Sequence, residues 1–176
     1  MKLCVFCSAN WSIAPEFFKK AEELGHWAAK QGHTIVFGGH DAGLMHAVSK
    51  ACHENGGQCI GIVPRKIEEM GKVSPFLDVH IPTEDLSDRK GLMMVQSDAF
   101  VVLPGGIGTL DELFTVVAAK TLDLLAKPVI LYNIDGFWDS LIAMLDDLHG
   151  RGVTRKQWRS YLSVVTSLDE LAALLA

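Results

Sequence analysis

Short apolar, β-branched segments alternate with longer amphipathic segments along nearly the whole chain of 176 residues. Parallel strands need long crossover connections, and strands covered by helices on both faces are apolar throughout. The alternation therefore predicts an α/β fold, with a Rossmann-like, doubly wound and mainly parallel sheet and helices on both faces. No internal repeat, low-complexity tract or linker interrupts it, so residues 1–176 are expected to form one domain.

Glycine and proline residues mark where these elements begin and end. Pro15 opens the first helix and Gly32 follows its end, while Pro104 closes a fully apolar run. The expected strands lie at residues 3–6, 34–37, 59–63, 79–81, 99–103, 128–132 and 162–166. The expected helices lie between Pro15 and Gly32, at 44–54, 86–97, 109–125 and 137–148, and after a capping box of Ser167 and Glu170. The charged segment 64–77 is expected to form a loop or a short surface helix.

The charge balance argues against several classes of partner. Sixteen Lys and Arg against 21 Asp and Glu give a formal net charge of −5, with both signs mixed along the chain. No nucleic acid and no anionic membrane surface is therefore expected as the main partner. No apolar stretch approaches the ~20 residues of a membrane span, and the first residues resemble a strand rather than a signal peptide. The expected location is the cytoplasm.

Four cysteines occur, at Cys4, Cys7, Cys52 and Cys59. The first two form a CxxC, but they lie in an apolar run, and positions i and i+3 of a strand point to opposite faces. A redox pair is expected at a helix start instead. Reduced, buried thiols are therefore the preferred interpretation.

The glycine-rich loop PGGIGT at 104–109 follows the most apolar strand and leads into a helix. Gly105, Gly106 and Gly108 allow the backbone to turn tightly and to approach a ligand. The helix N-terminus adds unpaired N–H groups and the positive end of the helix dipole. Together these features predict an anion site, with phosphate as the expected anion. The spacing matches neither a Walker loop nor GxGxxG.

Glu112 lies one turn into the same helix and has two interpretations. Its spacing from Thr109 fits a capping box, in which the carboxylate would only satisfy a backbone N–H. A carboxylate beside a phosphate site could instead face the sugar of a ligand. Spacing alone leaves both readings open.

Two other segments follow or precede strands of the expected sheet. The loop GGHDAG at 38–43 also joins a strand to a helix, with His40 and Asp41 at its tip. Arg89 and Lys90 are adjacent on a helix and so point about 100° apart. Such a pair is usually solvated, but the start of this helix could reach the ligand crevice. The seven histidines form no HExxH or similar cluster, so no metal site is expected.

Taken together, GGHDAGLM (38–45), DRK (88–90) and PGGIGTLDE (104–112) resemble the Lonely Guy family of cytokinin riboside 5′-monophosphate phosphoribohydrolases, also labelled lysine decarboxylase-like. The resemblance runs from CSAN (7–10) through PVILYNIDGFW (128–138). It implies a Rossmann-like homodimer that binds a nucleoside 5′-monophosphate. It also implies hydrolysis of the N-glycosidic bond of adenosine 5′-monophosphate, or an N6-substituted form, to free base and ribose 5-phosphate. No cofactor is implied, because no lysine is set up for a pyridoxal phosphate Schiff base.

The resemblance places the family's functional positions on named residues of this chain. The catalytic positions fall on Arg89 and Glu112. The substrate-binding positions fall on Ser8, Gly39, Arg89, Lys90, Gly105, Gly106, Ile107, Gly108, Thr109 and Glu112. A further substrate-contacting glutamate of relatives would correspond to Glu68 or Glu69.

The chain departs from the family pattern at three positions: Ser87 replaces a histidine, and His40 and His46 each replace a glycine. These departures leave open which base is preferred. They also keep a second hypothesis in view, a non-catalytic carrier of a nucleotide or of the molybdenum cofactor, since relatives of this fold bind such ligands without cleaving them.

Overall fold

The computed structural model describes residues 1–176 and contains one seven-stranded sheet, in which every neighbouring pair of strands is parallel. The strand order is β4-β3-β2-β1-β5-β6-β7. The strands are β1 (Lys2–Phe6), β2 (Thr34–Phe37), β3 (Gln58–Pro64), β4 (Val79–Thr83), β5 (Ala99–Val102), β6 (Val129–Tyr132) and β7 (Ser163–Val165). The predicted Rossmann-like parallel sheet is confirmed.

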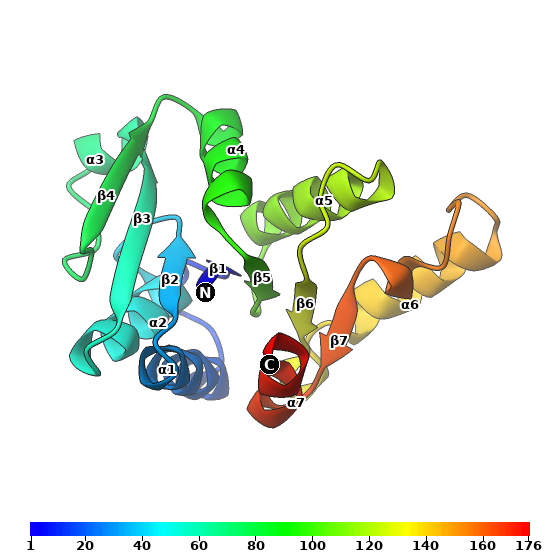
Figure 1. The fold of residues 1–176 in the computed structure, drawn as a ribbon, viewed down its shortest axis with the longest axis horizontal. Helices are drawn as coiled ribbons and strands as arrows, with labels where there is room; N and C mark the ends of the chain where they lie inside the picture. The colour runs from blue at the N-terminus through cyan, green and yellow to red at the C-terminus, as the bar shows by residue number, and fades with distance from the viewer.

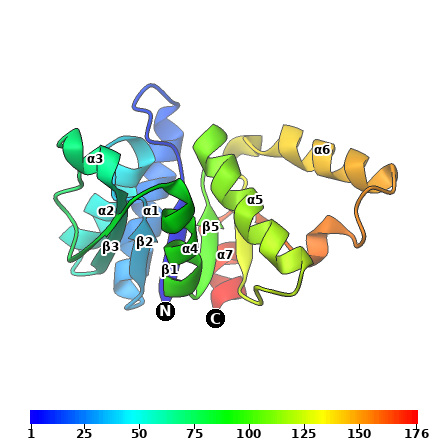
Figure 2. The same ribbon diagram turned by 90° about the horizontal axis from the view of Figure 1, so that it is seen from above.

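The chain has seven α-helices, and all but the short third helix contribute to the hydrophobic clusters on the two faces of this sheet (Figures 1 and 2). The helices are α1 (Pro15–Lys30), α2 (Gly43–Glu54), α3 (Arg65–Glu69), α4 (Leu86–Gln96), α5 (Ile107–Thr121), α6 (Asp139–Gly150) and α7 (Leu168–Leu175). Short 3-10 turns occur at Ile134–Gly136 and Trp158–Ser160. None of the helices combines the length and the apolar character that a membrane crossing requires.

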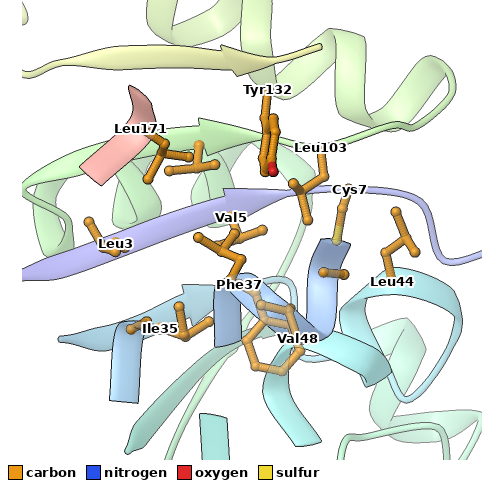
Figure 3. Close-up of a cluster of buried hydrophobic side chains, with 14 of the residues drawn as sticks. Leu3, Val5, Cys7, Ile35, Phe37, Leu44, Val48, Leu103, Tyr132 and Leu171 are labelled. Carbon is orange, nitrogen blue, oxygen red and sulfur yellow. The ribbon is translucent and has the colours of Figure 1, made fainter. Parts of the chain in front are cut away.

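Two hydrophobic clusters hold the layers together, one on each face of the sheet. The first joins the sheet to α1, α2 and α7, and Figure 3 shows part of it, including Leu3, Val5, Phe37, Leu44 and Leu171. The second joins the opposite face to α4, α5 and α6. Cys7 belongs to the first cluster and Cys4 to the second, so the CxxC cysteines lie on opposite faces, as the strand geometry predicts. All four cysteines are buried and free.

Several element boundaries differ from those expected. The helix expected at 109–125 begins at Ile107 and ends at Thr121, and Asp123 beyond it has a positive φ of 56° that helical backbone does not tolerate. The helix expected at 137–148 is α6, which begins at Asp139 and ends at Gly150, and a 3-10 turn at Ile134–Gly136 precedes it. The segment 64–77 contains the short helix α3. The Ser167 cap is confirmed, since its Oγ accepts from the Glu170 N–H at 3.2 Å.

The topology creates one switch point, at β1. In the sheet, β1 lies between β2 and β5. The connection after β1 leads to β2 on one side, and the connection after β5 leads to β6 on the opposite side, so the two connections diverge from the carboxyl ends of β1 and β5. In doubly wound sheets, ligands bind in the crevice that this divergence opens. The Ser8 N–H donates to the Pro104 carbonyl at 3.0 Å, and the Ser8 carbonyl accepts from Leu44 N–H at 2.8 Å. The loops after β1, β2 and β5 therefore meet at this point.

Candidate functional site

The N-terminus of α5 is open to a ligand. Gly106 is its N-cap residue, no side chain caps it, and its first turn holds no acidic residue. The helical ladder begins with Leu110 N–H donating to the Gly106 carbonyl, which leaves the N–H groups of the preceding turn free. A Cβ on Gly106 or Gly108 would meet nothing within 4 Å. This loop has the free donors, the dipole and the open approach that an anion needs.

Gly105 has a different role in the same loop. A Cβ at this position would lie 2.0 Å from Thr109 Oγ1. The glycine thus lets the buried Thr109 fold back against the loop, which tightens the turn between β5 and α5. Packing explains the glycine at 105, and no internal contact explains those at 106 and 108.

Glu112 does not cap α5. The helix begins at Ile107, so Glu112 lies in its second turn, beyond reach of the free N–H groups. Its side chain is 2% exposed, and its Oε1 accepts a hydrogen bond from Arg89 Nη2. The capping-box interpretation is therefore wrong, because α5 starts two residues earlier than the expected boundary, with Gly106 rather than Thr109 as its N-cap.

The Arg89–Glu112 pair links α4 to α5 across 23 residues of sequence. Arg89 is 13% exposed, and its Nε is buried without a hydrogen-bond partner. Burial raises the pKa of Glu112 to about 7, and the Arg89 guanidinium partly opposes that rise. The pair is thus a carboxyl that titrates near neutral pH beside a cation with unused donors.

The β2–α2 loop supports Arg89 from the other side. A Cβ on Gly38 would stand 3.1 Å from Arg89 Nη1 and 3.4 Å from Met45 Cε, so the glycine leaves room for both side chains. Gly39 and Gly43 have φ values of +69° and +54°, which favour glycine, and a Cβ on either would overlap neighbouring atoms. These two positions are glycine for reasons of backbone and packing.

A cavity of about 530 Å³ joins these features. Six predicted site residues line it: Ser8, Arg89, Gly106, Gly108, Thr109 and Glu112. Six residues that the sequence did not single out as binding positions line it too: Cys7, Ala9, Asn10, His40, Met45 and Ile67. All six of the second group follow β1, β2 or β3, where the fold class alone directs attention to the carboxyl ends of the strands.

The remaining predicted binding positions lie elsewhere. Gly105 lines a smaller neighbouring cavity of about 330 Å³, with Ser8, Gly106 and several apolar side chains. Gly39 and the 84%-exposed Ile107 line neither cavity. Lys90 also lies outside both, and its Nζ donates to both carboxylate oxygens of Asp111 at 2.8 Å.

The two candidate glutamates on α3 point to other partners. Glu68 Oε1 lies 2.7 Å from His80 Nε2 on β4, and Glu69 lies 4.0 Å from Lys66 on the same helix. Neither glutamate lines the main cavity. Ile67, which precedes both glutamates in the chain and follows the end of β3, does line it.

The three departures from the family pattern are placed differently. Ser87 is exposed in the first turn of α4, where its N–H donates to the N-cap Asp85. His46 Nδ1 lies 2.6 Å from Asp41 Oδ1 and outside the cavity. His40 alone lines the cavity. No group of three or more His, Cys, Asp or Glu side chains is arranged to hold a metal ion.

Comparison with curated proteins shows close relatives over the full chain. A cytokinin riboside 5′-monophosphate phosphoribohydrolase of Arabidopsis thaliana is 32% identical over 99% of this chain and 82% of its own length. A probable cytokinin riboside 5′-monophosphate phosphoribohydrolase of Oryza sativa subsp. japonica is 35% identical over 98% of this chain and 71% of its own length.

Solved structures share the fold at lower identity. The molybdenum cofactor binding protein of Rippkaea orientalis has a TM-score of 0.77 at 24% identity, covering 99% of this chain and 94% of its own. The Moco carrier protein of Chlamydomonas reinhardtii has a TM-score of 0.74 at 24% identity, with the same coverage. A family profile described as possible lysine decarboxylase matches residues 45–175. With that match and phosphoribohydrolase relatives at 32–35% identity, this chain belongs to the Lonely Guy family.

Proposed function

We propose that the protein hydrolyses the N-glycosidic bond of adenosine 5′-monophosphate, or of an N6-substituted form, to free base and ribose 5-phosphate. One observation carries this proposal: the buried pair of Glu112 and Arg89 lines the same cavity as an uncapped helix N-terminus. The names of the two plant relatives support it. No lysine lines this cavity, whereas a pyridoxal phosphate decarboxylase needs one for its Schiff base.

The phosphate of the substrate would bind at the start of α5. Free N–H groups of residues 107–109 and the helix dipole favour a dianion there, and Ser8 stands beside them at the cavity wall. Bound at this point, the phosphate would hold the ribose in one position over the cavity. Binding energy from a group that does not react would then orient the bond that does.

Glu112 would act on the ribose. Departure of the base leaves positive charge on the sugar, and a carboxylate beside the anomeric carbon stabilises that charge and can take a proton from the attacking water. With a pKa of about 7, Glu112 is substantially ionised at neutral pH and still basic enough to accept a proton. The burial that raises its pKa thus suits the role of general base.

Arg89 would hold Glu112 in place and balance charge as the base departs. One of its nitrogens donates to Glu112, which fixes the carboxylate, and its buried Nε has no partner within the protein. A guanidinium with donors to spare can serve the carboxylate and the substrate at once.

A product assay tests this function. The protein is incubated with a panel of nucleoside 5′-monophosphates, including N6-substituted AMP, and free base and ribose 5-phosphate are measured. Release of both in equal amounts is expected with at least one adenosine monophosphate. Recovery of every nucleotide intact would overturn hydrolysis and favour the carrier hypothesis.

We also propose that two copies of the chain associate through the α4–α5 face. These helices lie next to each other on one side of the sheet (Figure 2). The two helices expose Leu86, Val95 and Phe114, and Leu122 is exposed at the end of α5; the exposed fractions range from 38% to 74%. Large exposed apolar side chains on neighbouring helices are typical of protein interfaces. Light scattering coupled to size-exclusion chromatography should give twice the chain mass of 19.2 kDa.

A cytoplasmic location is proposed from cysteine chemistry. All four thiols are free, and proteins of oxidising compartments more often pair their cysteines. Fractionation of the cells that produce the protein would test the proposal.

A further inference from the structure

The residues that line the cavity follow several neighbouring strands of the sheet. The strand order brings the ends of β3, β2, β1 and β5 side by side in that sequence. Gly106, Gly108 and Thr109 follow β5, whereas His40 and Met45 follow β2 and Ile67 follows β3. A ligand whose phosphate is held at α5 therefore extends its other end toward His40, Met45 and Ile67.

His40 lines this end of the cavity and carries a polar atom without a partner. Its Nε2 is buried and has no hydrogen-bond partner in the protein. Backbone hydrogen bonds on both sides fix the residue, from Asp41 N–H to the Lys72 carbonyl and from Ser74 N–H to the Gly39 carbonyl, each 2.8 Å. A buried polar atom without a partner is unfavourable, and a bound ligand is one way to satisfy it.

The imidazole is suited to a neutral partner. Burial lowers the pKa of His40, nearby Lys72 lowers it further, and Asp41 opposes the change. The ring is thus uncharged at neutral pH, where each nitrogen either donates or accepts one hydrogen bond. The edge of a purine offers both ring acceptors and, in adenine, an amino donor. Met45 and Ile67 add apolar surface against which a flat ring can pack.

We propose that His40 is a specificity-determining residue, whose Nε2 hydrogen-bonds the edge of a purine base packed against Met45 and Ile67. The inference rests on the proposed function, which puts the phosphate at α5 and the anomeric carbon at Glu112. The smaller cavity beside Phe17 and Phe137 does not take the base, because neither Glu112 nor Arg89 lines it. The scissile bond and the base must share one cavity.

Equilibrium binding separates the base contact from the phosphate contact. Dissociation constants for AMP, UMP and ribose 5-phosphate are measured by calorimetry for chains that are wild type at position 40, or carry His40→Ala, His40→Gln or the control His26→Ala on α1 away from the cavity. Each chain also carries Glu112→Gln, so that AMP stays intact during the titration. His40→Ala should weaken AMP binding about three- to tenfold, the effect of one neutral hydrogen bond. Ribose 5-phosphate binding should stay within about twofold, and the preference for AMP over UMP should shrink by the same factor as AMP binding.

The His40→Gln variant distinguishes the loss of a hydrogen bond to the base from a change in the structure of the loop. The Gln side-chain amide can replace the imidazole nitrogen, so His40→Gln should recover most of the AMP affinity, and His26→Ala should match the wild type. Unchanged AMP binding in His40→Ala overturns the proposal. Equal weakening of AMP and ribose 5-phosphate also overturns it, as does a glutamine variant that melts like the wild type yet binds AMP no better than His40→Ala.

Failure of the two proposals can be told apart. If the wild type binds AMP but never releases base, hydrolysis is wrong, and the ratio of AMP to ribose 5-phosphate affinities still tests His40. If the wild type binds neither ligand, both proposals are wrong.

Discussion

The β5–α5 loop and the β2–α2 loop both follow a buried central strand, are rich in glycine, and lead into helices without a side-chain cap. They differ in what surrounds the glycines. A Cβ on Gly106 or Gly108 would meet open space, whereas a Cβ on Gly39 or Gly43 would come within 2.4–2.6 Å of neighbouring atoms. At the start of α2, Leu44 N–H already donates to the Ser8 carbonyl, while the corresponding donors of α5 are free.

The comparison shows that glycine serves two purposes at one edge of the sheet. In the β2–α2 loop it permits positive φ and close packing, and this packing builds the wall behind Arg89. In the β5–α5 loop the glycines at 106 and 108 leave space for a molecule that is not part of the chain. The first loop is therefore structural support, and the second is the surface that we propose binds the phosphate.

The largest expected effect comes from removing the acid next to the binding loop. Glu112→Gln should lower kcat about 10²- to 10⁴-fold, as expected for the loss of a general base. The amide oxygen can still accept from Arg89, but the Arg89 charge loses its counter-charge, so the variant should fold with reduced stability. Asp111→Asn, one residue earlier and outside the cavity, is the matched control. Full turnover by Glu112→Gln would exclude Glu112 from catalysis.

A methyl group in the supporting loop should affect the fold. Gly43→Ala places a Cβ 2.6 Å from the backbone of Ala9 and Asn10, at a φ of +54°. Left-handed backbone and overpacking together should destabilise the protein by about 2–5 kcal/mol. Urea unfolding of the two proteins measures the difference. A variant as stable as the wild type would contradict the claim that glycine in the β2–α2 loop is required for packing.

The same methyl group in the binding loop should affect the ligand instead. Gly108→Ala meets no protein atom and replaces glycine in a helix, so stability should be unchanged or up to about 1 kcal/mol higher. Nucleotide binding should weaken about tenfold or more, because a phosphate loses close contact with charge-assisted donors. Calorimetry gives the affinity and a thermal melt gives the stability. Undiminished binding would show that the phosphate lies elsewhere.

The pH dependence of activity should follow Glu112. Burial raises the pKa of this carboxyl from 4.5 to about 7, so the basic form is lost as the pH falls through that value. The logarithm of kcat/KM should drop by about one for each pH unit below 7. The phosphate of the substrate titrates near pH 6 and contributes only at lower pH. The residual activity of Glu112→Gln isolates that contribution, and an identical profile in both proteins would contradict the assignment.

The smallest effect is expected at Lys90, which tests how far the binding surface extends. Its ammonium pairs with the half-exposed Asp111 outside the cavity, and such pairs contribute about 0–1 kcal/mol. Lys90→Ala should therefore change kcat/KM by less than about threefold, within that range. A loss of tenfold or more would support the substrate contact that the family resemblance implies.

Local features of the sequence were sufficient for most of the fold. Apolar runs, helical periodicity and flanking glycine or proline predicted the strands and the main helices, because these signals act over a few residues. The opposite faces of Cys4 and Cys7 followed from strand geometry in the same way. Boundaries were less accurate where glycine allows more than one backbone, as at the start of α5.

The sequence by itself determined a parallel α/β sheet with a glycine-rich turn between a buried strand and a helix, and it predicted an anion site there, because backbone conformation depends on neighbouring residues. The tertiary structure alone decided what the side chains around that site do. Glu112 looks like a helix cap in the sequence, and only the packing of α4 beside α5 pairs it with Arg89. His40 joins the same cavity because the strand order sets the end of β2 next to β1. Such contacts depend on topology, which no short stretch of sequence encodes.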